Sequence, residues 1–218
     1  MEKIDPRPAP PSDIVTRVGA IDLLRALTMV LMIFVNDLWS LKDIPTWLEH
    51  VPRGVDGIGL ADVVFPAFLF IVGMSLPFAI DNRRAKGDSG LQLVRHIVGR
   101  SIALLIMGVL LVNGETINTR TTGMEAVVWD AVCCVAFILI WNAYPKTMPV
   151  WGQRSLKALG VLILLVLAFI YRGGADDHFV YFAPQWWGIL GLIGWAYLVS
   201  ALVTIFAQRR LIILIAGW

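Results

Sequence analysis

The pattern of apolar and polar positions divides the chain into long apolar runs separated by short polar segments. A helix that spans a bilayer needs about 20 mainly apolar residues, because the hydrocarbon core is about 30 Å thick and a helix rises about 1.5 Å per residue. The pattern predicts an all-α, polytopic integral membrane protein: a helical bundle with six transmembrane helices and the start of a seventh at Leu211. The six predicted spans are 20–40, 60–80, 97–113, 126–144, 156–171 and 186–207.

The two ends of the chain carry expectations of their own. Residues 1–16 are rich in proline and lack the apolar core of a signal peptide, so we expect a disordered tail there. Residues 17–218 then form a single transmembrane domain. Because the seventh apolar run stops at Trp218, we expect this domain to be incomplete at its C-terminus.

Composition agrees with a membrane protein and excludes several other classes. Hydrophobic residues make up 58% of the chain and charged residues 16%, whereas soluble domains contain about 25% charged residues. The net charge of +2 gives no broad basic surface for nucleic acid. The two cysteines, Cys133 and Cys134, are adjacent, so the sequence predicts neither a disulfide framework nor a metal site.

Lysine and arginine are distributed unequally between alternate loops, which predicts an orientation because basic residues favour the cytoplasmic side. A cytoplasmic N-terminus puts thirteen of them inside and four outside. The tail is therefore predicted to be cytoplasmic and the loop after the first helix to face outward. The inner residues are Lys3, Arg7, Arg17, Arg83, Arg84, Lys86, Arg95, Arg100, Lys146, Arg154, Lys157, Arg209 and Arg210; the outer ones are Lys42, Arg53, Arg120 and Arg172.

The first predicted helix carries a polar stripe. Polar and ionisable groups are costly inside a membrane, which makes each one a functional candidate. Arg25 and Asn36 lie within about 20° of each other around a helix, and Asp22 lies about 40° from Asn36 on the other side. The stripe is predicted to face the bundle interior. An ordinary ion pair between Asp22 and Arg25, three residues apart, is the alternative for those two residues.

Polar side chains from four predicted helices gather on the outer side. Asn36 ends the first helix, Asp62 opens the second, Asn113 closes the third and Asp130 lies early in the fourth. The other polar residues on the outer side are Asp37, Glu115, Asp176, Asp177 and His178. Some of the polar residues on this side are expected to be ordinary residues of the membrane–water interface.

Two prolines interrupt the second predicted helix. Pro66 leaves the carbonyl of Asp62 without its helical donor, and Pro77 does the same to Gly73. A free carbonyl in a membrane needs water or a neighbouring side chain. We therefore expect a kinked helix beside a polar cavity; the alternative is that the prolines are tolerated for packing.

His50 is the sharpest single candidate, because imidazole can accept and return a proton near neutrality. It lies in the loop between Asn36 and Asp62, at the mouth of the expected cavity. A loop histidine with no chemical role is the alternative.

Several motifs together resemble one family of membrane enzymes, the heparan-alpha-glucosaminide N-acetyltransferases. The resemblance is dense over residues 17–115 and patchy beyond. The motifs are IDLLRA at 21–26, FVN at 34–36, His50, LADVVFP at 60–66, FIVG at 70–73, RS at 100–101, GVLLVN at 108–113 and WWGILG at 186–191.

The resemblance implies an inner-membrane acyltransferase of a bacterial type that takes acetyl from cytoplasmic acetyl-CoA and modifies a sugar or glycan on the outer side. His50 occupies the place of the family's essential histidine and Asn36 that of its partner asparagine. His50 would be the general base or carry the acetyl group, and Asp62 would orient the imidazole or the acceptor.

Further residues are predicted to bind the two substrates. Asp22, Arg25, Asn113 and Asp130 are the candidates on the path to the acceptor. The basic residues Arg83, Arg84, Lys86 and Arg100 would hold the CoA phosphates, although the orientation rule alone also explains basic residues on that side.

Two departures from the family are visible. Residues 129–134 read WDAVCC where the family has a Gln-Arg pattern, and family members have more helices than this chain. Half of a secondary transporter for a small polar solute is the alternative function, and a structural or assembly protein ranks third. The acceptor, the choice between N- and O-acetylation, and homo-oligomer formation stay open.

Overall fold

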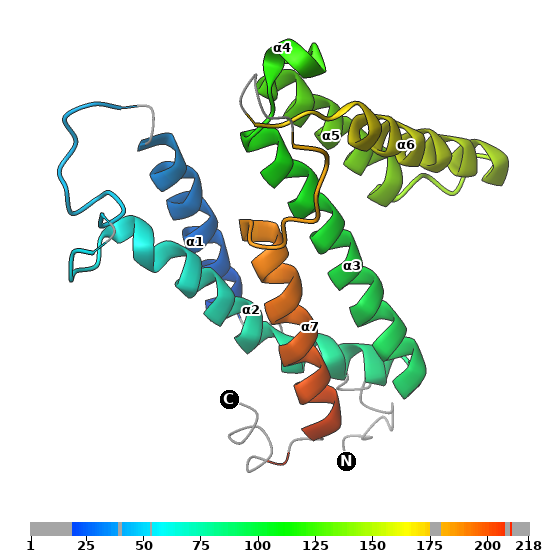
Figure 1. Cartoon of the computed structure of the whole chain (residues 1–218). Coiled ribbons are helices and arrows are strands. Elements are labelled where there is room, and N and C mark those ends of the chain that lie inside the picture. The colour runs from blue at the N-terminus through cyan, green and yellow to red at the C-terminus, as the bar shows by residue number, and fades with distance from the viewer. Residues whose placement is uncertain (1–18, 39–40, 53, 175–179, 208–209, 211–218) are drawn as a thin grey trace, which may run out of the picture. The chain divides into compact units, whose positions relative to one another are not determined.

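The computed structural model describes residues 19–38, 41–52, 54–174, 180–207 and 210 (Figure 1). Within these residues the chain forms helices and two isolated bridges, and no strand. The helices are α1 (Gly19–Leu38), α2 (Leu60–Ala85), α3 (Gly90–Glu115), α4 (Thr119–Thr122), α5 (Ala126–Trp141), α6 (Val150–Ile170) and α7 (Ile189–Ala207).

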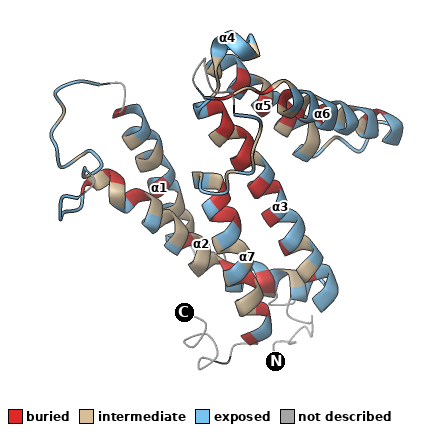
Figure 2. Cartoon of the chain, in the orientation of Figure 1, coloured by how far each residue is buried: buried red, intermediate tan, exposed pale blue. Residues whose placement is uncertain are grey.

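The predicted membrane architecture is confirmed. Five of the helices, α1, α2, α3, α6 and α7, are long and apolar enough to cross a membrane. The fourth predicted span, 126–144, corresponds to α5, which is equally apolar but has 16 residues. Little of α1 is buried within the chain itself, as Figure 2 shows, so its apolar side chains are available to lipid. The predicted tail and the predicted start of a seventh helix lie outside the described residues.

The turn between α2 and α3 is shorter than the sequence pattern suggested, because α2 continues to Ala85 and α3 already begins at Gly90. Gly87 has a φ of 89°, and the backbone N–H groups of Gly87 and Asp88 cap the carbonyls of Arg84 and Arg83. Ser89 and Gln92 then cap the start of α3 reciprocally. These local caps lengthen both helices beyond their apolar runs.

The chain divides into two compact units, of which the first comprises Met1–Ile97 and Val199–Trp218. Here α1 packs against α2, and α2 buries Val64, Ile71 and Ile80. The helix α2 runs without a break through Pro66 and Pro77, and both prolines are exposed in this unit. The loop at 41–59 joins α1 to α2 (Figure 1).

The second unit, Val98–Leu198, has an apolar core built from α3, α5, α6 and the residue that follows α6. Trp129 is fully buried, and its indole N–H donates to the carbonyl of Leu110 at 2.9 Å. Its ring meets that of Tyr171 edge to face, with centroids 5.4 Å apart. A buried tryptophan needs a partner for its N–H, and here a helix carbonyl supplies one.

Glycine allows α3 and α7 to approach closely in this second unit. A Cβ atom built on Gly108 would lie 2.6 Å from the backbone nitrogen of Gly191. Helices in membranes often pack through such small residues, because there is no hydrophobic driving force between them and close backbone contact replaces it.

We expect Gly108→Ala to lower the free energy of unfolding by about 1–3 kcal/mol, because the new methyl group must push two backbones apart. Gly99→Ala on the same helix is the matched control, since nothing lies within 4 Å of its Cβ position. The control should be neutral or stabilising by up to about 1 kcal/mol. Unfolding in detergent, followed by tryptophan fluorescence, measures both; equal losses in the two variants would contradict the close packing.

Candidate functional site

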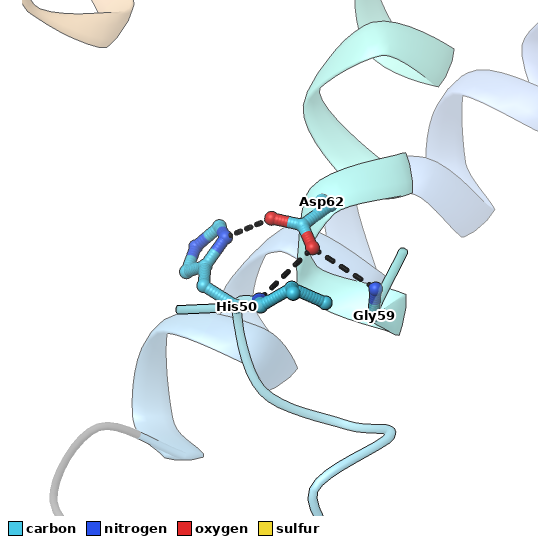
Figure 3. Close-up of polar contacts among 4 residues, drawn as sticks. His50, Gly59 and Asp62 are labelled. Atoms are coloured by element: carbon cyan, nitrogen blue, oxygen red, sulfur yellow. Dashed lines mark hydrogen bonds and ion pairs between the residues drawn. The ribbon is translucent and has the colours of Figure 1, made fainter. Parts of the chain in front are cut away.

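His50 and Asp62 form a hydrogen-bonded pair in the first unit (Figure 3). The imidazole Nδ1 lies 2.6 Å from Oδ1 of Asp62. The other carboxylate oxygen, Oδ2, accepts the backbone N–H groups of Val51 at 3.1 Å and Gly59 at 2.9 Å. One carboxylate thus binds the imidazole and two backbone N–H groups of the loop, those of Val51 and Gly59.

The start of α2 explains why Asp62 lies there. The first N–H groups of a helix have no partner within it, and an acidic side chain in the first turn can accept from them. Asp62 stands three residues after the N-cap Gly59 and reaches back to its N–H. The N–H of Leu60 is satisfied by the loop instead, through the carbonyl of Trp47 at 2.8 Å.

Gly59 is required at this N-cap because the chain passes too close for a side chain. A Cβ atom there would overlap the carbonyl oxygen of Glu49, the residue directly before His50. The backbone of the loop therefore lies directly against the backbone of the helix start, and this close approach brings His50 within reach of Asp62.

The geometry assigns different roles to the two imidazole nitrogens. A carboxylate only accepts hydrogen bonds, so Nδ1 carries the proton in the neutral ring and Nε2 is left with a free lone pair. The His50 side chain is 70% exposed, whereas Asp62 is 32% exposed. Nε2 can therefore meet a second molecule while Asp62 fixes the ring from behind, an arrangement suited to general-base or nucleophilic chemistry.

Of the polar residues of α1, Asp22 and Arg25 contact each other, whereas Asn36 is exposed. The Arg25 guanidinium lies 3.3 Å from the Asp22 carboxylate, so the ion pair considered as the alternative for these residues is formed. The Asn36 side chain is exposed. None of the hydrogen bonds among the described residues joins Asn36 to His50, and its role as the partner of His50 stays a prediction.

Asn113 and Asp130 lie in the second unit, in contrasting settings. Asn113 is fully buried, and its amide N–H₂ donates to the carbonyls of Val109 and Ala183 at 2.7 and 2.9 Å. Both of its donor hydrogens are thus engaged with backbone, which fixes the segment before α7 to α3. Asp130 is exposed, beside Gly114. The outer residues Asp176, Asp177 and His178 lie outside the described residues.

Three of the four predicted CoA-binding residues already make side-chain contacts within the chain. Arg83 forms an ion pair with Asp88 at 2.8 Å, and Arg84 donates to the carbonyl of Ile205 at 3.4 Å. Lys86 is exposed in the turn after α2. In the second unit, the Arg100 guanidinium lies 5.3 Å from the centre of the Tyr197 ring.

The sequence pattern did not indicate the roles of Gly59, Val51 and Trp47 around the pair. A glycine three residues before an aspartate at a helix start was the available signal, because it matches one half of a capping box. The backbone contacts of Val51 and Trp47 leave no trace in residue type, since any residue can supply an N–H or a carbonyl.

A family model described as "Heparan-alpha-glucosaminide N-acetyltransferase, catalytic" matches residues 17–181. The match covers most of the chain, including all of α1, α2, α3, α5 and α6. The chain belongs to this family. The heparan-alpha-glucosaminide N-acetyltransferase family was also indicated by the motifs, and that prediction is confirmed.

Two curated relatives carry the same family name. The heparan-alpha-glucosaminide N-acetyltransferase of Mus musculus is 37% identical over 101 residues, and that of Homo sapiens is 32% identical over 101 residues. Each match covers 44% of this chain and 14% of the relative. The chain therefore corresponds to a small part of these longer family members. No solved structure matches it.

We expect Gly59→Ala to release the loop, because the methyl group overlaps the Glu49 carbonyl. The N–H of Val51 should then exchange with solvent about fivefold faster or more, since a hydrogen bond is worth about 1 kcal/mol. Hydrogen–deuterium exchange of loop peptides measures this. Gly57→Ala is the control, because its Cβ would be 3.7 Å from Val51 side-chain atoms, an ordinary contact. Equal exchange in the two variants would contradict the proposed constraint.

Proposed function

We propose that this chain carries the histidine centre of a transmembrane acetyltransferase, which moves acetyl from acetyl-CoA to an amino or hydroxyl group of a sugar. The observation that supports it is the His50–Asp62 pair, with an exposed imidazole and a buttressed carboxylate, in a member of this family. The proposed domain is residues 17–218, with its N-terminus cytoplasmic and the His50 loop on the outer side of a bacterial inner membrane.

In the simpler route, Nε2 of His50 acts as general base. It takes a proton from the acceptor as the acceptor's nitrogen or oxygen attacks the thioester carbonyl. The carbon–sulfur bond breaks, the acetyl group passes to the sugar, and the thiolate of CoA takes up the proton. Asp62 stabilises the imidazolium that forms after this proton transfer, because its carboxylate already accepts a hydrogen bond from Nδ1, which lies 2.6 Å from Oδ1.

In the second route, Nε2 attacks the thioester itself, and CoA leaves as the thiolate. The acetyl group then rests on His50 until the acceptor attacks it, and the proton that the acceptor loses reaches the thiolate or solvent. Both routes use the same free nitrogen and the same Asp62 hydrogen bond. They differ in whether CoA is released before the sugar binds.

The remaining candidate residues complete the proposal. Asn36 would orient the imidazole or donate to the developing oxyanion. The residues proposed for the acceptor and its path are Asp22, Arg25, Asn113 and Asp130. For Asn113 we propose a positioning role, because its amide hydrogens are engaged with backbone carbonyls.

The CoA phosphates are proposed to bind the basic residues near the α2–α3 turn and on α3, because guanidinium and ammonium groups suit phosphate. Arg83 would have to exchange its contact with Asp88, whereas Lys86 is exposed. These residues are Arg83, Arg84, Lys86 and Arg100. The transporter alternative is not favoured, since the family description is that of a catalytic domain.

The proposal is tested by release of CoA thiol from acetyl-CoA with glucosamine, using membranes that contain the protein. His50→Ala should reduce sugar-dependent release to background. Asp62→Asn should reduce it about 10²- to 10⁴-fold, because an amide can donate to Nδ1 and so favour the wrong tautomer. Asp56→Asn, an exposed aspartate of the same loop, should keep full activity.

Continuous thiol release without the sugar, beyond one equivalent per protein, or release that survives in His50→Ala, would overturn the proposed chemistry. Rapid mixing without sugar distinguishes the routes: one equivalent of thiol released in a burst supports acetyl-His50, and no burst supports the general base.

A further inference from the structure

Trp47 lies three residues before His50, and its side chain is 64% exposed. Large aromatic side chains are normally placed where their area can be covered. Among the described residues, the ring pairs and cation–ring contacts involve other aromatic residues and not Trp47. The indole is thus free to meet something outside this part of the chain.

The backbone that carries Trp47 is fixed, although its ring is exposed. Successive turns are closed by the N–H of Leu48 donating to Pro45 at 2.9 Å and that of Glu49 donating to Thr46 at 3.3 Å. The carbonyl of Trp47 accepts the N–H of Leu60 at 2.8 Å. An exposed aromatic on a fixed backbone binds with little loss of conformational freedom.

The same stretch of loop carries His50. At one end the Trp47 carbonyl binds Leu60, and at the other the His50 ring and the Val51 N–H bind Asp62. Leu60 and Asp62 belong to one turn of α2. The indole and the imidazole therefore project from a single segment fastened at two points to the same helical turn.

We propose that Trp47 is a binding platform for the acceptor sugar and determines acceptor specificity. This inference rests on the proposed acetyl transfer, because that reaction brings the acceptor sugar next to His50. One face of a pyranose ring presents only C–H groups, which pack on the flat apolar face of an indole. A protonated amino group on the sugar is also attracted to that face before it loses its proton to solvent.

The charges of the loop favour a sugar over an anionic lipid surface. Asp43 and Glu49 are both exposed, and Glu49 lies between Trp47 and His50 in the chain. Carboxylates accept hydrogen bonds from hydroxyl and amino groups, and they repel anionic headgroups. A tryptophan that anchors the loop in the bilayer interface is the competing explanation, and the experiment below separates the two.

The test compares Trp47→Ala with Trp151→Ala, a tryptophan of α6 that is 73% exposed. In the thiol-release assay, Trp47→Ala should raise the KM for glucosamine about tenfold, the size expected for loss of an aromatic contact. The KM for acetyl-CoA should not change, and Trp47→Phe should recover most of the loss. Trp151→Ala should behave as the unchanged protein.

Binding is measured separately, by saturation-transfer NMR of glucosamine with the His50→Ala protein in detergent. A glucosamine titration should give a Kd about tenfold higher for the double variant, His50→Ala with Trp47→Ala, than for His50→Ala alone. Glucosamine binding can be measured even if no acetyl transfer occurs. A protein that binds glucosamine through Trp47 but transfers no acetyl group is therefore distinguished from one in which Trp47 does not bind the sugar.

Three results would overturn the inference. One is an affinity for glucosamine that is the same with and without Trp47. Another is a glucosamine KM that changes equally in Trp47→Ala and Trp151→Ala. The third is an unchanged KM together with quenching of Trp47 fluorescence by nitroxide-labelled lipid, taken as the difference between the unchanged protein and Trp47→Ala, which would assign Trp47 to the bilayer interface instead.

Discussion

The carboxylate of Asp62 is the constraint on which the candidate site depends. It accepts one hydrogen bond from the His50 ring and two from backbone N–H groups, those of Val51 within the loop between α1 and α2 and of Gly59 at its end. A helix start with unpaired N–H groups makes this position favourable for a carboxylate in any case. The same interaction that caps α2 therefore also orients the imidazole, so the local stability of the helix and the proposed chemistry share one side chain.

A second constraint comes from the membrane, where every buried polar group needs a partner within the protein. In the second unit, two buried side chains pair with backbone carbonyls: Trp129 donates to Leu110, and Asn113 donates to Val109 and Ala183. The contact between Asn113 and Ala183 joins residues 70 positions apart in the chain. Polar residues inside a membrane protein are candidates for function, but here two of the most buried ones hold elements together.

Family membership and geometry support the same proposal from independent directions. The family match concerns the order and type of residues, whereas the distance between His50 and Asp62 concerns their placement. The matched relatives are much longer than this chain, and the proposal concerns only the candidate site that this segment carries. In our proposal, Trp47 extends that candidate site toward the acceptor and leaves the roles of His50 and Asp62 unchanged.

The sequence by itself determined the all-helical membrane architecture, the family and the two residues of the central pair. Long apolar runs have few alternatives to spanning helices, and the motif that ends in Pro66 places Asp62 at a helix start. Helix ends were less well predicted, since the α2–α3 turn depends on the caps at Gly87 and Ser89 and not on hydropathy.

Tertiary structure alone decided which polar groups meet. It engaged Asn113 with the carbonyl of Ala183 and closed the loop over Gly59, whereas the Asp22–Arg25 pair is a local contact that their spacing of three residues already offered. The physical reason is that residue types record polarity and size, while a hydrogen bond also requires its donor and acceptor atoms to approach within about 3 Å, and that approach is set by packing.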